Sequence, residues 1–440
     1  MRQLVVLLGG SSIARLIQTD GGQHRLSYDL AAVGEPLSVA LPLQPEAHHH
    51  SRVDPFLEGL LPDNAAVREA LARRFSVSPR NPFALLEHIG HDCAGAVQFA
   101  REEEAGDLLA RRGALQPISD EAVGKRLVAL AEDRAASWIA PAEGWSLAGA
   151  QAKIALRRVD GAWYEARGAE PTTHILKPGI SGMREQALCE HLCLGAAREA
   201  GIPAARTSYE RLGATEALVI ERYDRQMADG GRLATRLHQE DLCQATGTYP
   251  HRKYESNGGP SALDVITLLS RWATDDGASI RRFVDALILN VLLGAPDAHA
   301  KNYSILHSGR HRVLAPLYDL ASGLPYRRGG LVSSSGIGQP DDTPWRTVAM
   351  SIGGTRDLAA IGASRWERFA AEARLPGRAR MDGGAVVDRM RVLAALLPDA
   401  LATVIERERR ENPGLYTGKE IPSRLLDAVA VRCAEAAARP

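Results

Sequence analysis

An apolar helical segment that runs into a short polar loop places the strongest constraint on the fold of this 440-residue chain. Residues 286–293 read Ala-Leu-Ile-Leu-Asn-Val-Leu-Leu, which predicts a buried helix. Pro296 predicts the end of that helix and leaves Asp297 on a loop, with Asn302 five positions later. We therefore expect a rigid core helix to hold a loop that carries an acid and an amide at fixed spacing.

Two short apolar segments, 303–306 and 313–317, lead from Asn302 to a second acid, Asp319. As a β-hairpin they bring Asn302 and Asp319 close together at the open end. This order suits phosphoryl transfer, in which one carboxylate orients a hydroxyl while an amide and a second carboxylate hold Mg²⁺ against ATP phosphates. The Asp-x-x-x-x-Asn spacing matches the protein-kinase catalytic loop, although the chain contains neither His-Arg-Asp nor Asp-Phe-Gly. The alternative is a surface loop in which Asp297 and Asn302 cap local turns.

A loop of small residues in the first half of the chain could bind phosphate. Residues 146–153 read Ser-Leu-Ala-Gly-Ala-Gln-Ala-Lys and enter a predicted strand, so backbone N–H groups can face phosphate oxygens. Lys177 ends another predicted strand, 173–177, where it can reach ATP phosphates as a point charge. The loop is not a Walker A sequence, and an ordinary turn and a solvated surface lysine remain the alternatives.

The apolar segment 217–220 runs into Glu221-Arg-Tyr223 and predicts an adenine-binding hinge, because backbone groups must be offered at the edge of a nucleotide pocket. Asp224 could accept a ribose hydroxyl. A buried strand with a charged exit is the alternative, and the spacing alone does not decide between the two.

Composition narrows the possible partners and compartment. Lys+Arg and Asp+Glu both number 53, so the net charge is zero and gives no global attraction to nucleic acid. The chain has five scattered cysteines, an odd number that fits neither a disulfide framework nor a zinc site and indicates a reducing cytosol. The N-terminal apolar run is too short for a signal peptide or a membrane span and predicts a first strand that ends at Gly9-Gly10. We expect a cytoplasmic protein with no membrane partner.

The order of predicted elements indicates an α+β fold. Residues 1–105 form a first subdomain, which includes a half-buried strand at 37–43. Residues 106–225 form a small, mainly β lobe, in which segments 151–159 and 173–177 flank a turn at Asp160-Gly161. Residues 226–440 are mainly helical. A small mixed β lobe followed by a helical lobe predicts a bilobal, protein-kinase-like architecture with an additional N-terminal α/β subdomain.

Motifs along most of the chain resemble the HipA family of toxin serine/threonine kinases. The similar segments, in order, are 36–43, 56–62, 89–96, Ser146-Leu-Ala-Gly-Ala-Gln151, Thr173-His-Ile-Leu-Lys177, Glu221-Arg-Tyr-Asp-Arg225, 237–244, 253–260, Asp297-Ala-His-Ala-Lys-Asn302 and Pro316-Leu-Tyr-Asp319. So many motifs in the right order make coincidence implausible. One position departs from the family, whose loop usually reads Gly-Ala-Gln-Glu-Lys, because Ala152 replaces the glutamate. Loop closure or substrate choice could change with it.

The resemblance implies a role for each matching residue. Asp297 corresponds to the catalytic base, Asn302 and Asp319 to the Mg²⁺ ligands, and Ser146 to the serine that family members autophosphorylate to silence the kinase. The residues implied in ATP binding are Ala148, Gly149, Ala150, Gln151, Ala152, Lys153, Lys177, Glu221, Arg222, Tyr223, Asp224, His299, Lys301, Asn302 and Asp319.

The resemblance also implies partners and a biological role. Family members phosphorylate a protein, typically an aminoacyl-tRNA synthetase, and so arrest growth. They pair with a HipB-like helix-turn-helix antitoxin, through which contact with operator DNA is made. The competing hypotheses are a catalytically quiet co-repressor that works with a DNA-binding antitoxin, and a small-molecule kinase on the same fold.

Overall fold

The computed structural model describes residues 1–31, 34–132, 144–229, 233–326 and 345–440. The chain packs into two compact units. The first unit consists of Met1–Pro178, Leu212–Arg252 and Ser304–Arg312, and the second of Gly179–Arg211, Lys253–Tyr303 and Val313–Pro440. In the described parts of the chain, no helix combines the length and apolarity needed to cross a bilayer.

The N-terminal part of the first unit is built on a five-stranded sheet of order β4-β3-β2-β1-β5. Its strands are β1 (Arg2–Leu8), β2 (Ser11–Gln18), β3 (His24–Tyr28), β4 (His48–His49) and β5 (Val97–Ala100), all paired antiparallel. Both faces of β1 are buried, with Leu4 and Val6 in one core and Val5 and Leu7 in another. The predicted turn at Gly9-Gly10 is confirmed, since it joins β1 to β2.

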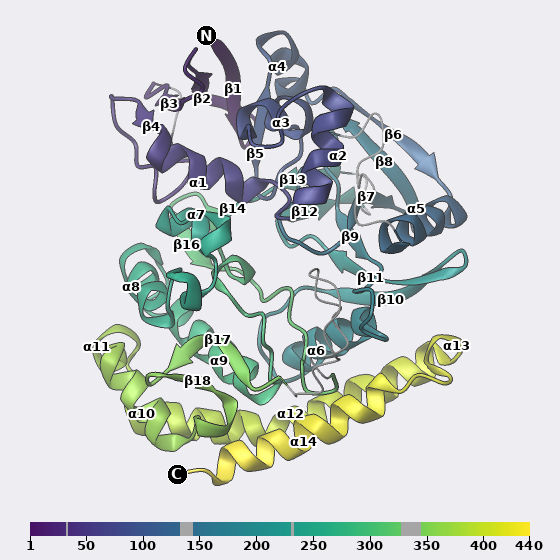
Figure 1. Ribbon diagram of the computed structural model, residues 1–440, viewed down its shortest axis with the longest axis vertical. Helices are drawn as coiled ribbons and strands as arrows, with labels where there is room; N and C mark the ends of the chain where they lie inside the picture. Colours follow the sequence, from purple (N-terminus) through teal and green to yellow (C-terminus); the bar gives the residue numbers. More distant parts are fainter. Residues whose placement is uncertain (32–33, 133–143, 230–232, 327–344) are drawn as a thin grey trace, which may run out of the picture. The chain divides into compact units, whose positions relative to one another are not determined.

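Four helices accompany this sheet. They are α1 (His50–Leu60), α2 (Ala65–Phe75), α3 (Pro82–Ile89) and α4 (Glu102–Leu109). Helices α1 and α3 pack against the sheet, as Figure 1 shows. The predicted strand at 37–43 is wrong: only an isolated bridge between Ser38 and Leu41 forms there. Pro36 precedes the segment, Pro42 lies within it, and the buried carboxylate of Glu240 accepts a hydrogen bond from Val39 N–H, so no ladder forms.

The second sheet of this unit carries the phosphate-loop region. Five of its six strands belong to this unit and run in the order β11-β9-β7-β8-β6, where β6 is Gly113–Ile118, β7 is Ile154–Val159, β8 is Ala162–Gly168, β9 is His174–Lys177 and β11 is Thr215–Glu221. Helix α5 (Asp120–Glu132) packs on β11. The turn at Asp160-Gly161 exists, but it joins β7 to β8, and the prediction had missed β8 altogether. β9 is the neighbour of β7 through a longer connection.

Shorter elements complete the first unit. They are β12 (Arg225–Ala228), β13 (Leu233–Arg236), β14 (His238–Asp241), α7 (Leu242–Thr246), the 3₁₀ turn η2 (Pro250–Arg252), β15 (Ser304–Ser308) and β16 (His311–Leu314). β14, β15 and β16 form one small sheet in that order. A strand hairpin therefore follows the Asp297 loop, as predicted, although its second strand ends at Leu314.

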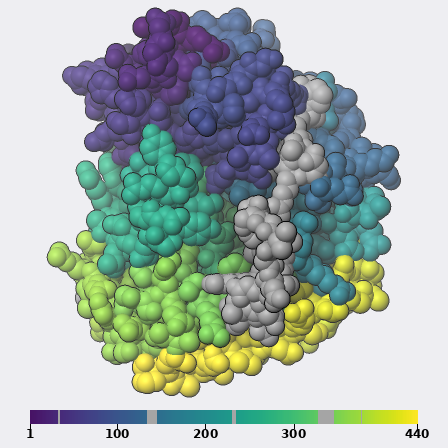
Figure 2. Space-filling model, viewed as in Figure 1, coloured from purple at the N-terminus to yellow at the C-terminus, as the bar shows by residue number. Residues whose placement is uncertain are grey.

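The second unit is mainly helical, as the sequence predicted. Its elements are α6 (Gln186–Glu199), β10 (Thr207–Leu212, whose last residue returns to the first unit), η3 (Glu255–Asn257), α8 (Ala262–Trp272), α9 (Ala278–Leu292), η4 (Ala300–Asn302), β17 (Thr347–Ile352), β18 (Thr355–Asp357), η6 (Leu358–Ala360), α10 (Ala363–Glu372), α11 (Leu375–Ala379), α12 (Gly383–Glu411), α13 (Pro413–Tyr416) and α14 (Ile421–Ala438). The long helix α12 packs on α6, α9, α10 and α14. Figure 2 shows the yellow surface of α14 along one edge of this unit.

All five cysteines are free and buried, so none of them forms a disulfide. Cys189 and Cys193 lie one turn apart on α6 and are fully enclosed.

Candidate active site

The loop that carries Asp297 is fixed to the end of α9. Helix α9 is buried along most of its length, and Ala295 N–H donates to Asn290 O at 2.8 Å to close its last turn. Gly294 adopts a positive φ of 55°, and a Cβ there would lie 2.5 Å from the Leu324 side chain. Only glycine fits this close approach without strain. The chain therefore leaves the helix in one defined direction.

Asp297 is the exposed residue of an otherwise buried loop. Its side chain is 61% exposed, whereas every residue from Ala298 to Asn302 is buried. The main-chain oxygen of Asp297 accepts hydrogen bonds from His299 N–H at 2.8 Å and from Asn302 Nδ2 at 2.7 Å. Because Asn302 uses its amide nitrogen inside the loop, its oxygen is the atom left to face a cation. This arrangement presents a carboxylate to solvent from a rigid support.

Tyr254 contacts this carboxylate and was given no role in the sequence analysis. Its hydroxyl donates to Asp297 Oδ1, and its ring packs edge-on against His299 with centroids 4.8 Å apart. The backbone beside it holds the loop as well, since Ala300 N–H donates to Lys253 O at 3.3 Å. The signal was present in the sequence, because residues 253–260 form one of the family-like motifs.

His299 is neutral near pH 7. Burial, followed by the positive charge of Lys253, lowers the pKa of His299 to about 3. Its Nε2 lies 3.8 Å from Asp297 Oδ1, so the contact between them is not an ion pair at neutral pH. The loop therefore carries its negative charge at Asp297 without a compensating imidazolium.

The segment of Asp319 is tied to the Asp297 loop. Tyr318 Oη donates to Lys301 O at 2.8 Å, which joins the residues that directly precede Asp319 and Asn302. Asp319 itself has a left-handed backbone with φ of 55°. Such a conformation is uncommon outside glycine and is tolerated best by Asp and Asn. Aspartate at this position is therefore compatible with the backbone of the turn as well as with the predicted binding of Mg²⁺.

Asn302 and Asp319 fit Mg²⁺ by the nature of their donor atoms. An amide oxygen and a carboxylate are the hard ligands that Mg²⁺ prefers, with water and phosphate oxygens completing an octahedron. Within the described residues, no group of three or more His, Cys, Asp or Glu side chains forms a separate metal centre.

The first unit holds the small-residue loop in a defined conformation. Gly149 has φ of 107°, its oxygen accepts from Asp63 N–H at 3.0 Å, and Lys153 Nζ donates to Ala148 O at 2.6 Å. Ser146 is fully buried, and its hydroxyl donates to Leu60 O at 2.7 Å. The loop is thus anchored on α1 and on the residues that follow it.

Lys177 and the predicted hinge lie on paired strands of the same sheet. Strand β11 pairs antiparallel with β9, so that Leu218 faces Lys177 and Glu221 faces His174. Lys177 is buried to 95%, since its exposed fraction is 5%, while Glu221 is exposed and Tyr223 is half-buried. Within the first unit the Lys177 strand and the strand that leads to the predicted hinge therefore lie side by side.

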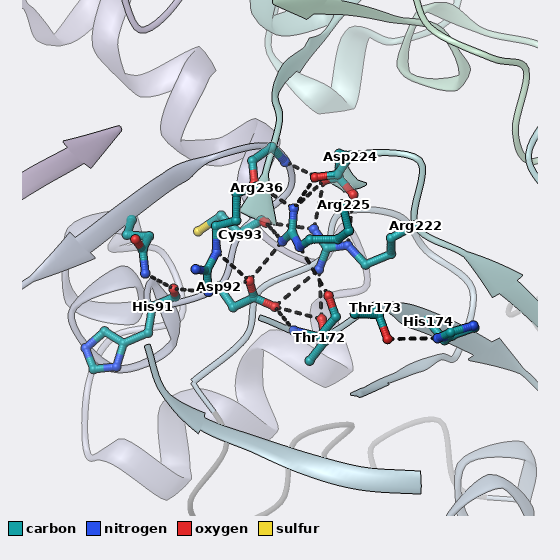
Figure 3. Close-up of polar contacts among 12 residues, drawn as sticks. His91, Asp92, Cys93, Thr172, Thr173, His174, Arg222, Asp224, Arg225 and Arg236 are labelled. Carbon is teal, nitrogen blue, oxygen red and sulfur yellow. Dashed lines mark hydrogen bonds and ion pairs between the residues drawn. The ribbon is translucent and has the colours of Figure 1, made fainter. Parts of the chain in front are cut away.

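Arg222 and Asp224 lie in a buried polar cluster. Arg222 Nη2 lies 2.9 Å from Asp224 Oδ2, and Gly95 N–H donates to the same oxygen at 2.7 Å (Figure 3). Burial alone would raise the pKa of Asp224, and the arginines overcome that effect and lower it to about 2. The Asp224 carboxylate is thus engaged by protein groups, and contact of these two side chains with a nucleotide stays a prediction.

Comparison with known proteins extends over most of the chain. A family model described as the HipA N-terminal domain matches residues 4–100, and one described as the HipA-like C-terminal domain matches residues 145–394. The protein named "Putative kinase Y4mE" from Sinorhizobium fredii is 34% identical over 443 residues, which cover 98% of both chains. The serine/threonine-protein kinase toxin HipA from Shewanella oneidensis is 31% identical over 305 residues, 66% of this chain and 67% of that protein.

A solved structure matches the fold across nearly the whole length. The Shewanella oneidensis complex of HipA, HipB and its operator DNA superposes with a TM-score of 0.79 at 26% identity, covering 98% of this chain and 96% of that chain. The match includes both the mixed β part and the helical part. This chain therefore belongs to the HipA family of serine/threonine-protein kinase toxins and has the α+β, protein-kinase-like fold of that family.

Proposed function

We propose that this kinase is the toxin of a type II toxin–antitoxin module, which uses ATP and Mg²⁺ to phosphorylate a serine or threonine of a translation protein and so arrests growth. One observation carries the chemical part: Asp297 holds an exposed carboxylate on a loop that is otherwise buried, next to an asparagine whose amide nitrogen is already bonded. That pairing is what a phosphoryl-transfer site requires.

In the proposed reaction Asp297 accepts the proton of the substrate hydroxyl. The oxygen of that hydroxyl attacks the γ-phosphorus of ATP, and ADP leaves. Asn302 and Asp319 would hold Mg²⁺, which supplies positive charge to the phosphate oxygens when it is bound. Lys177 would bind a phosphate as a point charge. The main chain of Glu221 and Tyr223 would receive the adenine, and residues 148–153, with His299 and Lys301, would line the phosphates.

The environment of Ser146 supports a regulatory role for its phosphorylation. Its hydroxyl is enclosed and donates to Leu60 O. A phosphoserine has no hydroxyl proton for that bond, and it would place a charge of about −1.5 to −2 in a buried site. Modification at Ser146 would therefore require the loop to leave this position and would prevent its return. We infer that autophosphorylation silences the kinase in this way.

The proposed partners rest on the relatives. The solved Shewanella oneidensis structure contains HipA with HipB and operator DNA, which supports an antitoxin of that type and DNA contact through it. An aminoacyl-tRNA synthetase is the substrate class that the family resemblance implies. The second hypothesis is a catalytically quiet co-repressor, and the intact set of Asp297, Asn302, Asp319 and Lys177 favours the enzyme.

Incubation of the purified protein with labelled ATP and Mg²⁺ tests the proposal. We expect label at Ser146, located by mass spectrometry, and a loss of at least about 100-fold in labelling rate for Asp297→Ala, which lacks the general base. Ser146→Ala should bind ATP by calorimetry yet take up no label at that site. When produced without antitoxin, wild type should stop growth and Asp297→Ala should not.

Two outcomes would contradict the proposal. Equal behaviour of wild type and Asp297→Ala, with no nucleotide binding by either, would leave the co-repressor hypothesis in place. Labelling of Ser146 without any growth defect would retain the kinase chemistry and exclude the toxin role.

A further inference from the structure

A buried cluster of charged side chains in the first unit has no role in the proposed chemistry. We call it the Asp92 cluster; its members are Asp92, Arg222, Asp224, Arg225 and Arg236 (Figure 3). Four of these side chains are at least 95% buried, and Arg236 is 12% exposed. Removing charges from water is costly, so a cluster of this kind requires an explanation beyond stability.

Asp92 is the centre of the cluster. Its Oδ2 accepts from Thr172 N–H at 2.9 Å and from Thr172 Oγ1 at 2.7 Å. Its Oδ1 accepts from Arg225 Nη2 at 2.8 Å and from Arg236 Nε at 3.0 Å. Burial alone would raise the pKa of Asp92, but the arginines outweigh burial and lower the pKa well below its usual range. Asp92 is therefore ionised at every physiological pH.

The main chain of Asp92 holds the segment that leads into the phosphate loop. Asp92 N–H donates to Gly144 O at 3.1 Å, and Ser146 N–H donates to Asp92 O at 3.0 Å, so Asp92 and Trp145 form an isolated parallel bridge. Two residues beyond Ser146 the loop of residues 148–153 begins. The direction in which that loop leaves is thus set at Asp92.

The side chain of Asp92 holds the other two nucleotide segments. Thr172 lies two residues before the strand that ends at Lys177, and it is bound to Asp92 through both its amide and its hydroxyl. Arg222 directly follows Glu221, donates from its own N–H to Thr173 O at 2.9 Å and reaches Asp92 Oδ2 with Nη1 at 3.3 Å. Asp92 thereby joins the phosphate loop through its main chain, and the Lys177 strand and the hinge through its buried carboxylate.

We propose that Asp92 is a positioning residue of the kinase, which holds these three segments in register so that they bind ATP together. The proposal rests on the proposed function, since it assigns ATP to these segments. Asp92 acts through its neighbours and not by contact with the nucleotide. Residues 90–95 of the N-terminal domain are on this account part of the nucleotide site.

Asp92→Asn in the full chain is the direct test. The asparagine amide keeps the shape of the Asp92 carboxylate, but it replaces one oxygen that accepts hydrogen bonds with an NH₂ group that faces other donors. The three arginines of the cluster are then left with Asp224 as their single carboxylate. We expect ATP affinity, measured by calorimetry, to fall about tenfold or more, while the labelling rate at saturating ATP changes less than about threefold. Such a split between binding and turnover is not expected from a loss of stability alone.

Glu240→Gln is the matched control. Glu240 is equally buried in the same unit and accepts from Ser38 Oγ, from Val39 N–H at 3.0 Å and from His307 Nε2 at 3.0 Å, away from all three segments. The Glu240→Gln variant should have a lower melting temperature, as Asp92→Asn does, but it should bind ATP with the same affinity as wild type. Equal ATP affinity of wild type and Asp92→Asn would overturn the positioning role while the kinase proposal stands.

Amide hydrogen exchange provides a readout that does not require ATP. The Ser146 and Thr172 amides should exchange at least about tenfold faster in Asp92→Asn than in wild type or Glu240→Gln. Asp92→Asn/Arg236→Gln restores the wild-type net charge of +1 in the cluster. It should therefore recover part of the amide protection and part of the ATP affinity. If the Ser146 and Thr172 amides exchange in Asp92→Asn at the wild-type rate, the positioning role is contradicted, even in a protein that binds no nucleotide. Failure of wild type to bind ATP would instead reject the proposed function.

Discussion

Individual residues decide the chemistry of this site through their immediate contacts. Asp297 was predicted from its spacing to Asn302, but spacing cannot show that one side chain is exposed while its neighbours are buried. Nor could it show that the hydroxyl of Tyr254 lies on the Asp297 carboxylate. A hydrogen bond to an ionised group fixes its orientation and is worth more than a neutral one. Tyr254 is therefore expected to orient the base.

Tyr254→Phe tests this contact because it removes only the hydroxyl and keeps the ring against His299. We expect the rate of Ser146 labelling at saturating ATP to fall roughly tenfold, since a hydrogen bond to a charged group contributes about 1.5–3 kcal/mol. The KM for ATP and the melting temperature should stay close to those of wild type. A labelling rate equal to that of wild type would show that Asp297 needs no such support.

At the scale of elements, the proposed catalytic loop depends on helix α9 and on the residue that follows Asn302. Asn290 on α9 donates from Nδ2 to the hydroxyl of Tyr303, the residue after Asn302, and both groups are buried. The Tyr303 ring also packs edge-on against Phe283, with centroids 5.1 Å apart. The hydrophobic pattern predicted this helix and the hairpin. The hydrogen bond between Asn290 and Tyr303 joins residues thirteen positions apart, and no periodic pattern in the sequence indicates it.

Tyr303→Phe should lower the free energy of unfolding by about 1–3 kcal/mol, because it leaves the buried Asn290 amide without its acceptor. Asn290→Leu/Tyr303→Phe should recover much of this loss, since both polar partners are then gone and leucine has the same branching as asparagine. Urea unfolding of the three proteins measures the effect. Additive losses in the double variant would contradict a direct coupling.

At the scale of the whole molecule, buried neutral histidines make the fold sensitive to acid. His238 in the first unit donates from Nε2 to Leu37 O at 2.8 Å. Burial, followed by the nearby His307, lowers its pKa to about 4, and the ring centroids of the two histidines are 5.0 Å apart. The unfolded chain takes up a proton at this residue near pH 6.5, whereas the folded chain does not. Stability is therefore lost as the pH falls from about 6.5 toward 4.

For His238 this loss amounts to roughly 2 kcal/mol at pH 5. His238→Gln, which can still donate to Leu37 O, should therefore lose about that much less stability than wild type between pH 7 and pH 5. Urea unfolding midpoints, measured for both proteins across this pH range, give the comparison. The slope of the midpoint against pH is the quantity to compare, because the substitution also changes stability at pH 7. Parallel slopes for the two proteins would show that His238 does not carry the effect.

Local patterns and motifs were sufficient to predict the class of fold, the family and the candidate chemistry. Apolar periodicity gave α9, and strand patterning gave β7, β9 and β11, because both patterns are local and repeat along the chain. The order of motifs identified the kinase family, and that identification is confirmed by relatives along the whole chain.

Only the tertiary structure decided which polar groups meet. The expected strand at residues 37–43 became a turn because Glu240, two hundred positions away, bonds to it. Asp224, expected at a ribose, is engaged by Arg222 and Gly95, and Asp92 became the centre of a cluster that spans residues 92 to 236. Each of these contacts joins segments distant in the chain. Their pairing is set by burial and charge compensation in the folded state, which leave no periodic trace in the order of residues.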